Sequence, residues 1–93
     1  NARVIDIICE LQNYHANVHV FDPWADKDEA QAEYGLPLID APQAGFYDAI
    51  IICVGHQQFR VLGAGQIRAY GKPGHVLYDV KHILPKDTVD ARL

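Results

Sequence analysis

Five side chains in this 93-residue sequence are of a type, and at a spacing, that could take part in chemistry. Lys81 and His82 follow an apolar run, and a cation there could pair with a phosphate or a sugar hydroxyl. Cys53 and His56 have C-x-x-H spacing, which can belong to a zinc site or to a thiol with its base. Asp22 ends a shorter apolar run, where dinucleotide folds place an acid on the ribose hydroxyls.

Each of these residues also has an ordinary structural explanation. An acid before proline more often caps a turn, and no glycine-rich turn precedes Asp22 as a dinucleotide fold requires. Residues three apart in a strand point to opposite faces, so Cys53 is better explained as a core thiol. The remaining histidines are dispersed, and no metal site is predicted. Lys81 can be read as an exposed lysine that closes a strand.

The element that would position His56 is a strand at residues 49–53. Its consecutive apolar residues lack helical or alternating periodicity, which predicts a strand buried on both faces in a parallel sheet. Ligands bind beyond the carboxyl ends of such strands, so His56 is expected at the mouth of any site. A last strand at residues 75–80 would bring Lys81 and His82 to the same side of the sheet.

The rest of the chain alternates helices with strands. Helices are predicted at residues 2–14, 27–34 and 57–62, short strands at 18–21 and 36–39, and a turn at 71–74. Asp26 and Glu29 have capping-box spacing for the second helix, and its acids form a solvated face. Gly63 and Gly65 interrupt the third helix, and Pro85 keeps the tail from continuing as strand.

This order predicts the α/β class, as a Rossmann-like three-layer domain with a small parallel sheet and right-handed crossovers. Such folds normally start with a strand, whereas this chain starts within a helical pattern and without Met. The sheet is therefore expected to lack its first strand, as in a piece cut from a longer protein.

Composition is that of one small globular domain, residues 1–93, with 49% hydrophobic and 22% charged residues. A net charge of -4 with scattered Lys and Arg argues against nucleic-acid or anionic-membrane partners. No apolar run approaches the roughly 18 residues of a membrane span. Cys9 and Cys53 lie in apolar stretches without CxxC spacing, which predicts buried free thiols in a reducing cytoplasm.

Five motifs, in order and at matching spacing, resemble the C-terminal UDP-binding domain of the UDP-glucose/GDP-mannose dehydrogenase family. The corresponding segments are Asn1–Ile8, Val18–Pro23, Tyr47–Ile51, Val54–Phe59 and Leu77–Lys81. The family patterns that they match are RNS-[KR]-V-x-D, V-x-V-[YF]-DP, YDA-[IV]-[IV], V-[AG]-H-x-x-F and [LY]-D-x-[KR]. The Asp-Val-Lys form of the last motif is most similar to the bacterial branch that acts on UDP-N-acetylhexosamines.

The resemblance implies a parent enzyme that oxidises the C6 hydroxyl of a UDP-sugar to a carboxylate with two NAD, through a covalent adduct on a Cys. The NAD fold and the catalytic Cys belong to other domains, so neither Cys9 nor Cys53 inherits the nucleophile role. Lys81 occupies the place of the basic residue that contacts the substrate, where the UDP-glucose branch has Arg. His56 and His82 are candidates for the rim of that site.

The same resemblance implies two partners, a UDP-sugar and the remaining domains of a homo-oligomeric dehydrogenase. It also implies a cellular role in the synthesis of capsule or O-antigen polysaccharide. The family's Phe-Lys strand and Asp-x-Arg segment are absent, so the chain alone is expected to be inert, to bind nucleotide poorly and to hold no cofactor.

Two readings from other classes remain open. A structural or oligomerisation module without ligand would also account for the polar helix at 27–34. A receiver-like signalling domain would need clustered acids at strand ends, and Asp22 with Lys81 is too small a set.

Overall fold

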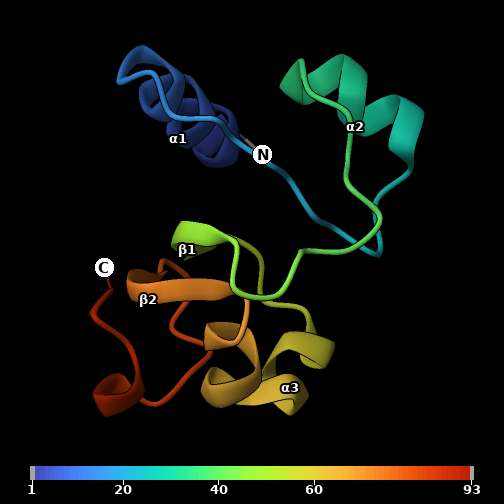
Figure 1. Cartoon of the computed structure of the whole chain (residues 1–93). Helices are drawn as coiled ribbons and strands as arrows, with labels where there is room; N and C mark the ends of the chain where they lie inside the picture. The colour runs from blue at the N-terminus through green and yellow to red at the C-terminus, as the bar shows by residue number, and fades with distance from the viewer. Residues whose placement is uncertain (1, 93) are drawn as a thin grey trace. The chain divides into compact units, whose positions relative to one another are not determined.

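The chain forms two compact units, Asn1–Pro42 and Gln43–Leu93, in a computed structural model that describes residues 2–92. The first unit holds two helices, and the second holds the sheet with its crossover helix (Figure 1). That the whole of residues 1–93 is one truncated binding domain stays a prediction.

The first unit begins with helix α1 (Ala2–Asn13). Val4 and Ile8, one helical turn apart, are buried, as the i, i+4 spacing of the apolar residues predicts. Cys9 is exposed, because it follows Ile8 by one residue and so lies about 100° further around the helix. The prediction that Cys9 is a buried thiol is therefore wrong.

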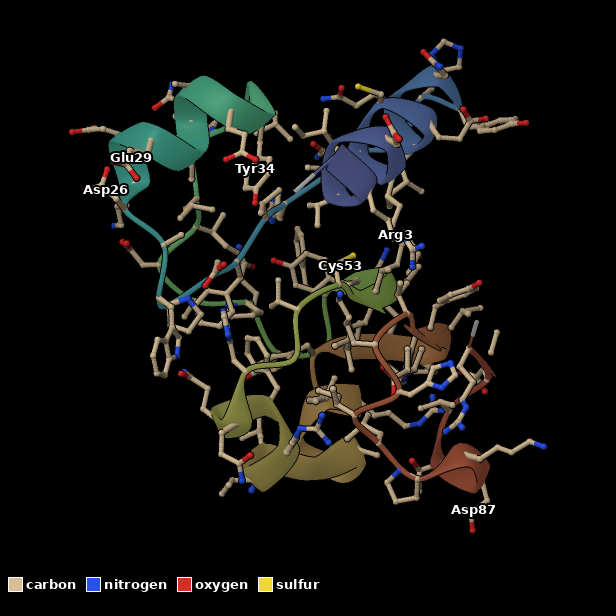
Figure 2. All side chains as sticks on the ribbon, turned by 180° about the vertical axis from the view of Figure 1, so that it is seen from behind. Arg3, Asp26, Glu29, Tyr34, Cys53 and Asp87 are labelled. Carbon is tan, nitrogen blue, oxygen red and sulfur yellow. The ribbon has the colours of Figure 1, made fainter. Side chains whose placement is uncertain are left out.

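Helix α2 (Lys27–Tyr34) has the predicted bounds and caps. The Asp26 side chain accepts a hydrogen bond from the Glu29 amide at 2.9 Å, and the two residues lie together at the start of the helix (Figure 2). Gly35 ends the helix with φ 74°, a left-handed conformation that glycine adopts readily. Of the eight helical residues only Ala30 is buried, which confirms the prediction of a mostly solvated helix.

The two strands predicted in the first unit are reduced to a single parallel bridge between Val20 and Leu38. The Ile39 amide donates to the Val20 carbonyl at 2.9 Å. A proline near each segment limits further pairing. Directly afterwards, the Trp24 amide donates to Asp22 Oδ1 at 2.9 Å, so the Asp22 carboxylate stabilises a turn, as the structural explanation for this residue predicts.

The second unit is built on a parallel sheet with the strand order β1-β2-β3. The strands are β1 (Tyr47–Ile52), β2 (Gly71–Asp79) and β3 (Ala91–Arg92). Helix α3 (Gln57–Arg68) connects the first two strands, as parallel pairing requires. The predicted Rossmann-like α/β class with a small parallel sheet is confirmed.

Strand β1 lies at an edge of this sheet, and the prediction that it is buried on both faces is wrong. It has one neighbour, β2, and only Ile52 is buried, whereas Asp48 and Ala49 are exposed. An apolar run shows what a strand can bury, but the rest of the fold determines what covers its faces.

Strand β2 begins four residues earlier than the predicted strand at 75–80. The pairing passes from Tyr47↔Gly71 to Ala49↔Val76, so the residues between Gly71 and Val76 form an irregularity in the strand. Gly74 has φ 81°, and the turn predicted at 71–74 therefore exists as a bulge within β2.

The tail after Pro85 contains a strand that the sequence did not predict. A single 3-10 turn, Lys86–Thr88, follows the proline. The Asp90 amide then donates to the Leu77 carbonyl at 2.9 Å, which brings β3 alongside β2. A two-residue strand has no periodicity of its own, and its pairing partner defines it.

The core of the second unit draws on the sheet, on α3 and on the segment after β2. Its buried members are Ile52, Ile67, Leu77, Ile83 and Leu84. Gly63 interrupts α3 with φ 80° and ψ 164°, which confirms the predicted break and lets both halves of the helix pack on the sheet. No helix within residues 2–92 is long and apolar enough to cross a membrane.

Candidate functional site

The carboxyl ends of β1 and β2 lie at the same side of the sheet, because the two strands are parallel. The Val80 amide donates to the Ile52 carbonyl at 3.0 Å, which extends their pairing to the last residue of β1. A Cβ atom on Gly55 would lie 3.7 Å from Ile83 Cγ2. The segments that follow β1 and β2, which carry the predicted site residues, therefore pack against each other.

Lys81 lies two residues beyond the end of β2 and is exposed. Its backbone amide donates to Asp79 Oδ1 at 3.2 Å. The residue before it, Val80, is bonded to Ile52 at the end of β1. The structure thus brings Lys81 beside the end of β1, at the side of the sheet where parallel α/β proteins bind ligands.

His82 is exposed next to Lys81 and has φ 56°. Residues other than glycine adopt this left-handed conformation uncommonly, and histidine is among those that do so more often. It reverses the chain between the outward Lys81 and the buried pair Ile83 and Leu84, so the backbone conformation of His82 turns the chain back into the core.

His56 is the N-cap residue of α3 and is half-buried. Its ring lies 5.7 Å from the ring of Phe59, tilted by 31°, and its side chain makes no capping hydrogen bond. His56 therefore stands on the same side of the sheet as Lys81, and its ring packs on the first turn of its own helix.

Cys53 directly follows β1 and is partly buried (Figure 2). Burial raises the pKa of the Cys53 thiol, and the positive charge of Lys81 opposes this rise only in part. A raised pKa keeps the thiol protonated, and the thiolate is the nucleophilic form. Within residues 2–92, no three side chains of His, Cys, Asp or Glu are grouped so that they could hold a metal ion.

Asp79, the last residue of β2, is a part of this region that the sequence analysis did not single out. Its side chain is fully buried and accepts hydrogen bonds from the amides of Lys81 and Leu84. The available signal was an acid inside an otherwise apolar strand, since buried acids are rare unless they are paired.

A second polar cluster, which the sequence also did not reveal, surrounds Arg68 at the end of α3. Arg68 Nη1 lies 3.1 Å from Asp90 Oδ2 and 3.1 Å from His75 Nε2. His75 Nδ1 lies 2.7 Å from the Lys72 carbonyl oxygen. Because a carbonyl only accepts, Nδ1 carries the proton and Nε2 accepts from the guanidinium.

This cluster fastens the C-terminal segment to the sheet. Arg68 also donates to the Thr88 carbonyl from Nε at 3.2 Å and from Nη2 at 3.1 Å. The Asp90 carboxylate accepts from the Leu77 amide at 2.7 Å. Its bonds to Arg68 first, and to the Leu77 amide second, hold the pKa of Asp90 below its ordinary value.

Parallel α/β proteins bind ligands beyond the carboxyl ends of their strands, and Lys81 lies at that side of this sheet. Residues 1–86 match the sequence model of the UDP-glucose/GDP-mannose dehydrogenase family, UDP binding domain. The chain belongs to this family, which confirms the resemblance seen in its motifs.

Two similar proteins are named UDP-N-acetyl-D-glucosamine 6-dehydrogenase. The chain is 47% identical over 93 residues to the one from Salmonella typhi and 46% identical over 93 residues to the one from Pseudomonas aeruginosa. Each match covers 100% of this chain and 22% of the relative. Protein CapL of Staphylococcus aureus is 34% identical over 90 residues, which are 97% of this chain and 21% of that protein. The chain thus spans about a fifth of the length of these relatives, and no solved structure matches it significantly.

Proposed function

We propose that this chain is the UDP-sugar-binding domain of an NAD-dependent nucleotide-sugar 6-dehydrogenase, and that Lys81 contacts the bound UDP-sugar. The observation that carries the proposal is the exposed Lys81 beyond the carboxyl end of β2 in a member of this family. Parallel sheets bind ligands at that side. A lysine ammonium can donate there to a phosphate oxygen or to a sugar hydroxyl.

The proposed substrate is a UDP-N-acetylhexosamine, which the parent enzyme oxidises at C6 to the uronic acid. The names of the two relatives above 45% identity support this class of sugar. The proposal extends to a cytoplasmic, homo-oligomeric parent enzyme whose product enters capsule or O-antigen polysaccharide.

Binding of NAD is proposed for the rest of the parent enzyme, because the residues of this chain do not fit the cofactor. A dinucleotide fold needs a glycine-rich turn between a strand and the N-terminus of a helix. The one G-x-G spacing of the sequence, Gly63 to Gly65, lies inside α3. No step of the oxidation is therefore assigned to this chain.

The chain by itself is proposed to be catalytically inert. Its partly buried thiol, Cys53, has a raised pKa, which disfavours the thiolate that a covalent adduct requires. The task of the chain is to bind and orient the nucleotide. Lys81 supplies positive charge, and His56 and His82 are proposed to line the rim of the same site.

Isothermal titration calorimetry of the full-length dehydrogenase with UDP tests the Lys81 contact. A charged hydrogen bond contributes about 1.5–3 kcal/mol, so Lys81→Ala should weaken UDP binding about tenfold or more. Lys81→Arg should retain most of the affinity because it keeps the charge. Lys86→Ala, at an exposed lysine of the 3-10 turn, should leave the affinity unchanged.

The outcomes separate two levels of the proposal. Unchanged affinity in Lys81→Ala would contradict the assignment of Lys81. A wild-type enzyme that binds no UDP at all would contradict the proposed function of the domain.

A further inference from the structure

The segment that carries Lys81 is organised around a buried carboxylate. Asp79 has 0% of its surface exposed, at the end of a strand whose other fully buried residue is Leu77. Removing a carboxylate from water is strongly unfavourable unless hydrogen bonds replace the water. The two oxygens of Asp79 therefore need hydrogen-bond donors inside the protein.

Each oxygen of Asp79 holds a different backbone amide of the turn that follows. Oδ1 accepts from the Lys81 amide at 3.2 Å, and Oδ2 accepts from the Leu84 amide at 2.9 Å. Hydrogen bonds to an ionised acceptor are stronger than neutral ones. The carboxylate thus links the beginning and the end of the turn at residues 80–84.

Other contacts restrain the same turn. The Val80 amide is bonded to the end of β1, and the side chains of Ile83 and Leu84 are buried in the core. Arg92 Nη1 donates to the Leu84 carbonyl at 3.4 Å. These contacts fix both sides of the exposed pair formed by Lys81 and its neighbour.

The backbone conformation of the neighbour, His82, supports this restraint. Its φ of 56° is a conformation that persists only where the surrounding structure determines it. The backbone of Lys81 is therefore held in one position, with its flexible side chain directed outward from a rigid base.

We infer that Asp79 is a positioning residue that fixes the backbone of Lys81 for contact with the bound nucleotide. The inference rests on the proposed function of Lys81. A pre-ordered turn loses less conformational entropy when the ligand binds than a mobile one does. Asp79 itself is buried and would not touch the ligand, so its effect on binding must pass through Lys81.

Asparagine is the informative replacement because it has nearly the shape of Asp79. Its amide group offers one acceptor oxygen, and its NH₂ group would face the second backbone amide with a donor. Asp79→Asn should therefore release one end of the turn without creating a cavity.

A double-mutant cycle in the full-length dehydrogenase, with UDP titrated by calorimetry, tests the inference. Asp79→Asn should weaken UDP binding about threefold or more in the wild-type background. In the Lys81→Ala background the same change should have an effect of less than about twofold. Asp90→Asn is the matched control, because that carboxylate also accepts from a backbone amide, that of Leu77, but does not contact the turn at residues 80–84 through it. It should lower the melting temperature without changing the affinity for UDP.

Two outcomes would overturn the inference while leaving the proposed function intact. In the first, Asp79→Asn weakens UDP binding equally in both backgrounds. In the second, Lys81→Ala weakens UDP binding but Asp79→Asn does not. No effect of Lys81→Ala would instead overturn the assignment on which the inference rests. If Asp79→Asn does not fold, Arg92→Ala takes its place in the cycle, since it frees the other restraint on Leu84. Wild-type affinity in Arg92→Ala would then count against a positioned turn.

Discussion

Asp90 stabilises the folded chain through its negative charge. Its bonds to Arg68 and to the Leu77 amide hold the pKa of Asp90 below its ordinary value of 3.8. A carboxyl whose pKa is lower in the folded state stabilises that state at pH values above the ordinary pKa. The stabilisation is lost as the pH falls through the folded value. Because the side chain is 44% exposed, solvent screens the effect and keeps it modest.

Asp90→Asn should accordingly lower the melting temperature of the chain near neutral pH. The difference from wild type should shrink as the pH is lowered towards about 2.5, because acid protonates the Asp90 carboxyl, first in the unfolded chain and at lower pH in the folded one. Thermal unfolding followed by circular dichroism at the two pH values measures this. Asp87→Asn, at an exposed acid of the 3-10 turn (Figure 2), should have little effect at either pH. A difference for Asp90→Asn that is the same at both values would contradict the charge-based account.

At the scale of single residues, the sequence predicted the location of Lys81 but not what holds it there. Its location follows from a strand that ends just before it, which is a local pattern. The bonds of Asp79 depend on the path of the following turn, which no spacing rule describes. The clustering of Arg68 with Asp90 joins residues 22 positions apart, and pairing at that distance leaves no local pattern.

Among the elements, the bulge at the start of β2 leaves no room for a side chain at Gly71. A Cβ atom at Gly71 would overlap the ring of His75. The ring could move away only by giving up its bonds to the Lys72 carbonyl and to Arg68.

Gly71→Ala should therefore destabilise the chain by about 1–3 kcal/mol, the usual range for overpacking. Gly65→Ala is the matched control in α3, because a Cβ atom there meets nothing within 4 Å. It should stabilise the chain by up to about 1 kcal/mol through helix propensity. Urea unfolding of both variants compares them directly, and a stabilising Gly71→Ala would contradict the packing described here.

Helices were predicted well in this chain because their signals are local. Asp26 and Gly35 mark both ends of α2, and Gly63 marks the break in α3, each by its own chemistry. Strands were predicted less well because pairing is set by distant residues. The pairing of β1 with a single strand and the bonds of Asp90 to Leu77 beside β3 both involve residues far apart in the sequence.

At the scale of the whole molecule, membership of the dehydrogenase family and the position of Lys81 lead to the same proposal. The family supplies the class of ligand, and the parallel sheet of Gln43–Leu93 supplies the side at which such a ligand binds. Under this proposal the chain contributes binding and orientation of the nucleotide, and oxidation takes place on other parts of the parent enzyme.

The most direct test of this proposal is a structure of the full-length dehydrogenase with a bound UDP-sugar. The measured quantity is the distance from Lys81 Nζ to the nearest oxygen of the ligand. The proposal predicts a direct bond to a phosphate or sugar oxygen at about 2.8 Å. A well-ordered UDP-sugar whose oxygens all lie beyond about 6 Å from Lys81 Nζ, too far for one bridging water, would contradict it.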